Sequence, residues 1–215
     1  MKTMIAIPCL DTIQTDFARS LIRMKPVGQV ATNFLESSLI YKSRTDLGLI
    51  ALSEKHDFVL WLDSDMVFPP DLMVDLMADM EGRDMVAGIC HMRRPPFTPV
   101  LYKKLRQGLT PAENDSAKLI DYPKDDLFKV EGCGFGCGFG CVMMRTTVLQ
   151  AVVDKYKALF DPLPGYGEDL SFCIRARGCG FDIWADPHVQ VGHKASTIVT
   201  DKTFDAYRKA GIAID

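Results

Sequence analysis

Phe58-Val59-Leu60-Trp61-Leu62-Asp63-Ser64-Asp65 joins five consecutive apolar residues to two acids that are one residue apart. A short apolar run of this kind suits a strand buried on both faces within a parallel sheet. Open α/β sheets bind ligands at the carboxyl ends of their strands, and side chains two positions apart on an extended chain point the same way. We therefore expect Asp63 and Asp65 to face one hard cation, Mg²⁺ or Mn²⁺, which prefers oxygen ligands and commonly binds substrate diphosphates.

A second interpretation of these acids is purely structural. Asp63 would cap the following segment and Asp65 would begin a turn, because Asp is common at both kinds of position and Asp-x-Asp often occurs by chance. The context favours ligand binding, since Pro69-Pro70 opens a segment with an apolar stripe at helical spacing. The stripe consists of Leu72, Met73, Leu76, Met77 and Met80. The acids thus lie on a strand-to-helix crossover.

Composition predicts one globular domain over residues 1–215. The chain has 47% hydrophobic and 25% charged residues, which is ordinary for a protein with one substantial core. The net charge of -3, with Lys and Arg spread along the chain, gives no reason to expect a nucleic-acid partner. Seven scattered cysteines and the lack of a secretory signal favour the cytoplasm. No apolar run is long enough for a transmembrane helix, although peripheral attachment at the inner face of a membrane stays open.

Strand and helix signals alternate along the first part of the chain. Strands are expected near 3–8, 28–35, 57–62 and 84–90, with helices around 12–24, from Ser37-Ser38, and over 71–81. This order predicts βαβ units, hence a Rossmann-like, mainly parallel sheet flanked by helices in a three-layer α/β/α arrangement. Residues 93–126 are rich in proline and charge and predict an insertion over the sheet. Two further helices are expected at Thr146–Leu159 and Glu168–Gly178.

One internal repeat occurs, Cys133-Gly134-Phe135-Gly136-Cys137-Gly138-Phe139-Gly140-Cys141. Its evenly spaced cysteines suggest a metal or iron–sulfur site, but on a strand the outer two would stand roughly 26 Å apart and could not share one metal unless the glycines bend the chain. Glycine at every second position also leaves one face bare. That face would allow close approach of another backbone or of a ligand such as a sugar ring.

A second group of chemically active residues lies in Gly165-Tyr166-Gly167-Glu168-Asp169. Acids in the first turn of a helix are stabilised by the macrodipole by about 0.3–1 kcal/mol, which alone would explain them. A carboxylate beside a glycine-rich loop is also well placed to accept a proton from an attacking hydroxyl. His188 and His193 follow near the end of a strand-like run, and their odd spacing would send them to opposite faces, so at most one is expected to face a metal.

Taken in their order along the chain, these sequence segments resemble a glycosyltransferase of the GT-A fold. They are most similar to family 2 and its short bacterial and phage-type members. The resemblance extends along nearly the whole chain. The residues that carry it are Ile5-Ala6-Ile7-Pro8, Arg44, Leu60-Trp61-Leu62-Asp63-Ser64-Asp65-Met66-Val67-Phe68-Pro69-Pro70-Asp71, Gly165-Tyr166-Gly167-Glu168-Asp169 and Val191-Gly192-His193. The implied division is a nucleotide-binding half at 1–92, the insertion at 93–126, and an acceptor and catalytic half at 127–215.

The resemblance implies a role for each matching residue. Asp63 and Asp65 would bind a divalent metal, Mn²⁺ or Mg²⁺, together with the sugar nucleotide, and His193 would complete the metal shell. Asp169 would be the general base, with Glu168 beside it. The other residues implied in donor binding are Pro8, Arg44, Ser64, Gly88 and Gly138.

The implied activity is metal-dependent transfer of a sugar from a nucleotide-diphosphate sugar to an acceptor hydroxyl, with inversion. UDP is expected ahead of GDP, and the acceptor would be a glycan, a lipid-linked molecule or another hydroxyl compound. The Gln-x-x-Arg-Trp motif is absent, so processive synthesis is not expected. Two alternatives stay open. One is a nucleotidyltransferase, although Cys9-Leu10-Asp11-Thr12 lacks its glycine-rich phosphate loop; the other is a non-catalytic sugar-nucleotide or glycan-binding protein.

Overall fold

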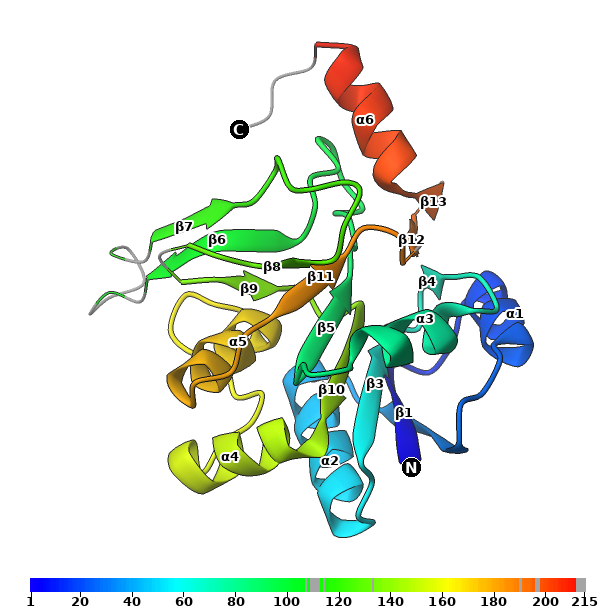
Figure 1. Ribbon diagram of the computed structural model, residues 1–215, viewed down its shortest axis with the longest axis vertical. Helices are drawn as coiled ribbons and strands as arrows, with labels where there is room; N and C mark the ends of the chain where they lie inside the picture. Colours follow the sequence, from blue (N-terminus) through cyan, green and yellow to red (C-terminus); the bar gives the residue numbers. More distant parts are fainter. Residues whose placement is uncertain are drawn as a thin grey trace.

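A mixed, mainly parallel sheet forms the centre of the protein in the computed structural model, which describes residues 1–106, 108, 113, 115–132, 134–189, 191–195 and 198–211. The described residues form seven strands in this sheet, in the order β2-β1-β3-β10-β5-β11-β8 (Figure 1). Their bounds are β2 (Gln29–Glu36), β1 (Lys2–Cys9), β3 (Phe58–Leu62), β10 (Cys141–Arg145), β5 (Met85–Gly88), β11 (Trp184–Asp186) and β8 (Phe128–Lys129). Strand β10 runs antiparallel to both β3 and β5, and β8 runs antiparallel to β11.

Side-chain alternation divides the core into two layers. On β1 and β3, Met4 and Val59 belong to a cluster on one face, whereas Ile5 and Leu60 belong to a cluster on the other. Helices α2, α4 and α5 pack on the first face, and α1 and α3 pack on the second. These helices are α1 (Thr15–Arg23), α2 (Ile40–Ser53), α3 (Leu72–Asp79), α4 (Thr146–Tyr156) and α5 (Glu168–Gly178). The three-layer α/β/α prediction is confirmed.

Two smaller sheets extend the central one. The first has the order β13-β12-β4 and the second the order β7-β6-β9. Their strands are β4 (Met66–Val67), β12 (Gly192–Lys194), β13 (Ile198–Val199), β6 (Leu101–Arg106), β7 (Asp115–Lys118) and β9 (Gly136–Cys137). Helix α6 (Asp201–Lys209) follows β13 and lies beyond β12 in the upper part of Figure 1. Because β12 pairs with β4, the end of the chain returns to the segment that follows Asp65.

Several predicted boundaries shift. The second helix begins at Ile40 rather than at Ser37-Ser38, and the strand predicted over 84–90 ends at Gly88. The helix predicted over Thr146–Leu159 ends at Tyr156, where Lys157 follows with a left-handed φ of 54°. A side chain in that conformation interrupts the helical hydrogen-bond pattern.

The cysteine–glycine repeat is not one continuous strand, contrary to the strand interpretation. Gly136 and Cys137 form β9, the chain turns, and Cys141 then begins β10. Cys133 lies outside the described residues, and both Cys137 and Cys141 are buried as free thiols. The bare glycine face accommodates neighbouring side chains. A Cβ at Gly136, Gly138 or Gly140 would lie 2.6, 2.7 or 2.9 Å from atoms of Leu105, Val100 and Cys90, respectively.

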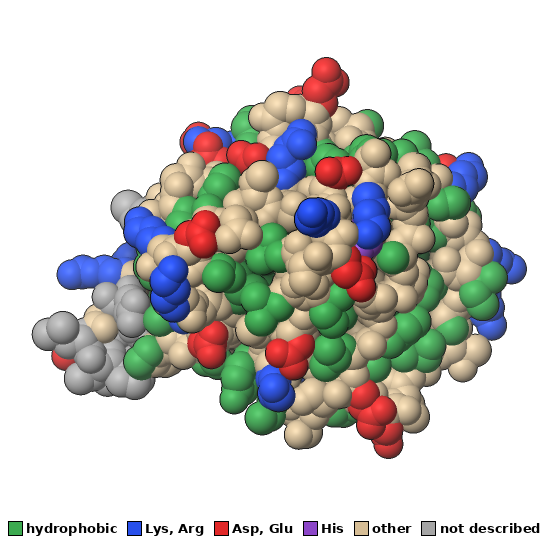
Figure 2. Space-filling model, turned by 90° about the horizontal axis from the view of Figure 1, so that it is seen from below, with side chains coloured by type: hydrophobic (Ala, Val, Ile, Leu, Met, Phe, Trp, Pro, Cys, Tyr) green, Lys and Arg blue, Asp and Glu red, His purple; other side chains and the backbone are tan. Residues whose placement is uncertain are grey.

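The visible surface is mixed in charge. Figure 2 shows Lys and Arg side chains interspersed with Asp and Glu, and hydrophobic side chains between them, on the face seen from below. Within the described ranges, no helix combines the length and apolarity that crossing a membrane requires.

A carboxyl pair formed by Asp79 at the end of α3 and Asp186 at the end of β11 makes stability depend on pH. Burial, followed by a hydrogen bond with Asp186, raises the pKa of Asp79 to about 7. The folded state therefore holds a proton that the unfolded state releases near pH 3.8, so this pair costs stability as pH rises from about 4 through 7. Asp79→Asn is expected to raise the melting temperature at pH 8 by about 2–4 °C, roughly 1 kcal/mol after allowance for solvent screening.

At pH 4.5 the same substitution should have little effect, because Asp79 is then already protonated. Glu81→Gln, which changes an exposed acid just beyond α3, is the matched control and should not produce this pH-dependent gain. Thermal unfolding followed by circular dichroism at both pH values provides the measurement. An equal shift at pH 4.5 and pH 8 would contradict the prediction.

Candidate active site

A pocket of about 370 Å³ opens at the carboxyl ends of β1 and β3. Open α/β sheets place ligands at this edge. Its described lining residues are Pro8, Cys9, Leu10, Ser37, Ser38, Ile40, Ser43, Asp63, Ser64, Asp65, Arg93 and His193. Five residues predicted for donor or metal binding thus come together here: Pro8, Asp63, Ser64, Asp65 and His193.

A turn, rather than an extended strand, presents the two acids. The Met66 amide donates to the Asp63 carbonyl at 3.1 Å, which closes the turn directly after β3. The Asp63 amide donates in turn to the Gly140 carbonyl at 3.2 Å, so the start of the turn is fastened to the segment before β10. The expected i,i+2 geometry was wrong, because the chain bends at Ser64. Both carboxylates nevertheless line the same pocket.

Asp65 has one engaged and one unengaged carboxylate oxygen. Its Oδ2 accepts from Arg93 Nη1 at 2.8 Å and lies 3.3 Å from His193 Nε2, whereas its buried Oδ1 has no hydrogen-bond partner among the described residues. Burial opposes ionisation, but the hydrogen bond and charge of His193 and the charge of Arg93 outweigh it and lower the pKa of Asp65. A charged carboxylate with a free, buried oxygen suits a hard divalent cation.

His193 reaches Asp65 through strand pairing, because β12 runs antiparallel to β4 with His193 opposite Met66. Its Nδ1 donates to the His91 carbonyl at 2.8 Å, which directs Nε2 toward Asp65. Burial lowers the pKa of His193, but the hydrogen bond with Asp65 outweighs it and the net shift is upward. A ring held through Nδ1 offers Nε2 to a metal. His188 lies elsewhere, with Nε2 2.8 Å from the Asp125 carbonyl.

Arg44 joins the two acidic motifs from beneath the pocket. It is 2% exposed, and its Nη2 donates to Asp63 Oδ1 at 2.6 Å while its Nε donates to Glu168 Oε1 at 3.3 Å. The guanidinium also lies 5.9 and 5.5 Å from the ring centroids of Trp61 and Phe139. Burial raises the pKa of Asp63 even though Arg44 opposes the shift. Arg44 thus holds the Asp-x-Asp turn and the start of α5 together.

Asp169 lies in the first turn of α5, as its position in the sequence predicts. Its Oδ1 accepts from the Leu170 amide at 2.7 Å. Burial, followed by the charge of Glu168, raises the pKa of Asp169 to about 6. A Cβ added at Gly138 would lie 3.6 Å from Asp169 Oδ2, an ordinary contact distance, so the Gly138 backbone lies beside this carboxylate. A carboxylate with a pKa near neutrality is suited to accept a proton.

Three predicted donor-binding residues, Arg44, Gly88 and Gly138, lie apart from the described pocket lining, and Gly138 lies beside Asp169 instead. Arg44 is buried behind the pocket, as described above. Gly88 ends β5, where a Cβ would lie 2.8 Å from Val189 and 3.2 Å from Cys141, so tight packing accounts for glycine at this position. Among the described residues, no group of three or more His, Cys, Asp or Glu side chains is arranged to hold a metal ion.

The sequence analysis did not predict Arg93, His91 or the pocket serines Ser37, Ser38 and Ser43 as site residues. Arg93 stands 28 residues after Asp65, at the start of the proline-rich segment, and nothing in its local sequence distinguishes it from Arg94. His91 acts through its backbone carbonyl, a group that every residue carries. Ser43 directly precedes Arg44 in α2. Its position beside this predicted residue was the one feature of the sequence that could have identified it.

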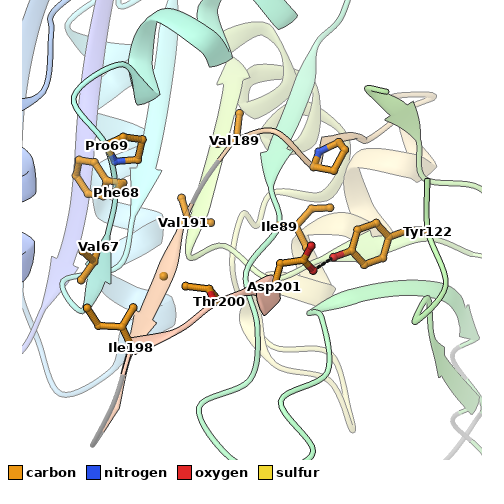
Figure 3. Close-up of a pocket in the computed structure, with 12 residues that line it drawn as sticks. Val67, Phe68, Pro69, Ile89, Tyr122, Val189, Val191, Ile198, Thr200 and Asp201 are labelled. Atoms are coloured by element: carbon orange, nitrogen blue, oxygen red, sulfur yellow. Dashed lines mark hydrogen bonds between the residues drawn. The ribbon is translucent and has the colours of Figure 1, made fainter. Parts of the chain in front are cut away.

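A smaller cavity of about 220 Å³ lies beside β12 and β4 (Figure 3). Its walls are mainly apolar, and Tyr122 donates to Asp201 at one side. His91 Nε2 lies 3.3 Å from Asp201 Oδ1, and Lys124 Nζ donates to the same oxygen at 2.9 Å. The contact with His91, followed by the hydrogen bonds from Tyr122 and Lys124, holds the pKa of Asp201 well below its usual range despite burial. This cluster anchors His91, whose carbonyl orients His193.

No protein-family model matches the chain, and no curated protein matches it. Among solved structures, A197 from STIV is similar with a TM-score of 0.59 and 18% identity, over 91% of this chain and 86% of that one. GalNAc-T7 with UDP, GalNAc and Mn²⁺ has a TM-score of 0.56 and 11% identity, over 89% of this chain. S. aureus TarS 1-349 has a TM-score of 0.52 and 15% identity, over 87% of this chain.

The chain spans 42% of the GalNAc-T7 chain and 58% of the TarS chain. At such identities the likeness concerns the fold, because unrelated activities recur on one fold. The comparisons confirm the predicted α/β class and its similarity to GT-A glycosyltransferases. Membership of family 2 stays a prediction.

Proposed function

We propose that the protein is a glycosyltransferase that moves a sugar from a nucleotide-diphosphate sugar to an acceptor hydroxyl. The observation that carries this proposal is the Arg44 bridge, which connects Asp63 at 2.6 Å with Glu168 at 3.3 Å. It couples a pocket lined by carboxylates and serines to a second acidic group that includes Asp169, with its pKa of about 6. The pocket carboxylates are suited to binding a metal-chelated diphosphate, and Asp169 is suited to accepting a proton. The UDP, GalNAc and Mn²⁺ in the GalNAc-T7 structure accord with this assignment.

The proposed reaction is a single displacement with inversion. The acceptor oxygen forms a bond to the anomeric carbon, the bond from that carbon to the diphosphate oxygen breaks, and the nucleoside diphosphate leaves with the bonding electrons. Asp169 accepts the acceptor's hydroxyl proton. Asp65 and His193, with Asp63, do not form a complete three-ligand site among the described residues, so they would hold the metal together with the donor phosphates. Mn²⁺ or Mg²⁺ would there offset the developing negative charge on the leaving group. We expect UDP ahead of GDP as this leaving group.

Asp65→Asn tests the donor site. Release of nucleotide from a panel of UDP-, GDP-, CMP- and dTDP-sugars is expected to require Mn²⁺ or Mg²⁺ and to fall at least about 100-fold in the variant, because the amide offers a weaker ligand than the carboxylate. The assay detects the released nucleotide with and without glycan or lipid-linked acceptors. Asp75→Asn, at an exposed acid of α3, is the control and should retain activity.

If the wild-type protein binds a sugar nucleotide but releases none of the nucleotide with any acceptor, the non-catalytic binding alternative replaces the transferase. If release is unchanged in Asp65→Asn, the donor site is assigned to the wrong acid.

A further inference from the structure

Arg93 adds a permanently charged cation to a pocket whose other titratable side chains include Asp63, Asp65 and His193. Among the described residues that line this pocket, Arg93 is the single Lys or Arg. Its side chain is 55% exposed. The backbone on either side is held in place, since His91 pairs with Pro99 and the Met92 amide donates to the Thr98 carbonyl at 2.9 Å. A fixed backbone with an exposed side chain allows the guanidinium to change partners without a change in fold.

Arg93 now pairs with Asp65, the carboxylate that a divalent cation in this pocket would need. Arg93 Nη1 donates to Asp65 Oδ2 at 2.8 Å, and His193 Nε2 lies 3.3 Å from the same oxygen. A guanidinium on Oδ2 repels a cation at either carboxylate oxygen of Asp65, so the two positive charges compete for this side chain. Arg93 is 55% exposed while Asp65 is 19% exposed, so water can solvate the guanidinium when it leaves this contact.

We propose that Arg93 exchanges partners when substrate binds: it pairs with Asp65 in the free protein and moves to the donor diphosphate once a divalent cation takes its place on Asp65. This inference rests on the proposed function, because it deepens the assignment of the same pocket. The planar guanidinium matches two phosphate oxygens at once, which a single ammonium does not. Released from Asp65, Arg93 would also supply positive charge where the carboxylates otherwise repel the phosphates.

The exchange predicts two effects of opposite sign in Arg93→Gln. Without the competing guanidinium, Mn²⁺ alone should bind more tightly, by about three- to tenfold. Without its phosphate contact, UDP at saturating Mn²⁺ should bind more weakly, by roughly tenfold. If Arg93 only held Asp65 in position, its loss would weaken both. The opposite signs therefore separate exchange from a structural role.

The experiment uses the full chain. Electron paramagnetic resonance of free Mn²⁺ measures metal binding, and calorimetry with UDP at saturating Mn²⁺ measures nucleotide binding. Arg94→Gln changes the neighbouring exposed arginine and should match the wild type in both. Arg93→Lys keeps the charge but loses the paired donors, so its affinity for UDP should fall between those of the wild type and Arg93→Gln.

Unchanged or weaker Mn²⁺ binding in Arg93→Gln would overturn the exchange, as would unchanged UDP affinity. If the wild type binds no UDP, GDP, CMP or dTDP, the proposed function itself fails. Nucleotide binding by the wild type together with unaltered affinities in Arg93→Gln would overturn the exchange alone.

Discussion

Asp169→Asn is expected to lower kcat by about 10²–10⁴-fold, equivalent to roughly 3–5 kcal/mol of transition-state stabilisation. The amide keeps the size of the side chain and can still accept from the Leu170 amide, as Oδ1 now does at 2.7 Å. It cannot accept the acceptor's proton. Single-turnover sugar transfer at saturating donor isolates this step, and affinity for the donor should change little because Asp169 is not part of the described pocket lining.

The pH profile provides a second readout of the same residue. Because burial and Glu168 raise the pKa of Asp169 to about 6, the active carboxylate form increases as pH rises through 6 and is nearly complete at pH 8. We expect the wild-type rate to rise over this range and then level, and the residual rate of Asp169→Asn to lose that dependence.

The stability of Asp169→Asn shows whether a loss of activity reflects misfolding. A carboxyl whose pKa is raised on folding costs stability as pH rises above its unfolded value, so removing its charge at pH 8 should leave the melting temperature unchanged or higher. Asp161→Asn, at an exposed acid before α5, is the control and should retain wild-type turnover. A folded Asp169→Asn protein with near-normal kcat would assign the base to another residue.

Arg44→Met is expected to lower the free energy of unfolding by about 2–3 kcal/mol. Removing one partner of a buried ion pair typically costs about 3–5 kcal/mol, and we reduce this value because the side chains of Asp63 and Glu168 are 27% and 17% exposed. Methionine fills much of the same volume between Trp61 and Phe139, so the loss reports chiefly the two unpaired carboxylates. The melting temperature should fall by about 4–12 °C.

Denaturant unfolding of the variant and the wild type measures this difference. Arg19→Met removes an exposed arginine that pairs with Asp16 at 3.1 Å and should change stability by less than about 0.5 kcal/mol. The destabilisation by Arg44→Met should diminish when Glu168→Gln is added, because one stranded charge is then absent. Additive losses in the double variant would contradict the bridging role.

Much of the fold follows from local pattern. Strand β3 and residues 4–7 of β1 are continuous apolar runs with apolar side chains on both faces. Both faces must therefore be covered, and the intervening amphipathic segments can supply that cover. The same reasoning placed Asp63 and Asp65 after a buried strand and Glu168 and Asp169 at a helix start, because those positions depend on neighbours in the chain. These features were predictable, apart from shifts at element ends, where several backbone conformations compete.

Only tertiary structure decided which of these pieces meet. The insertion of β10 between β3 and β5 depends on long-range strand pairing, which no local period encodes. His193 reaches Asp65 across 128 residues and Arg44 reaches Glu168 across 124, in each case because packed strands and helices set the geometry. Arg93 and the His91 carbonyl carry no local signal at all. Short sequence segments thus determined which acids could take part in chemistry. Burial and contacts in the folded chain determined their charges, pKa values and partners.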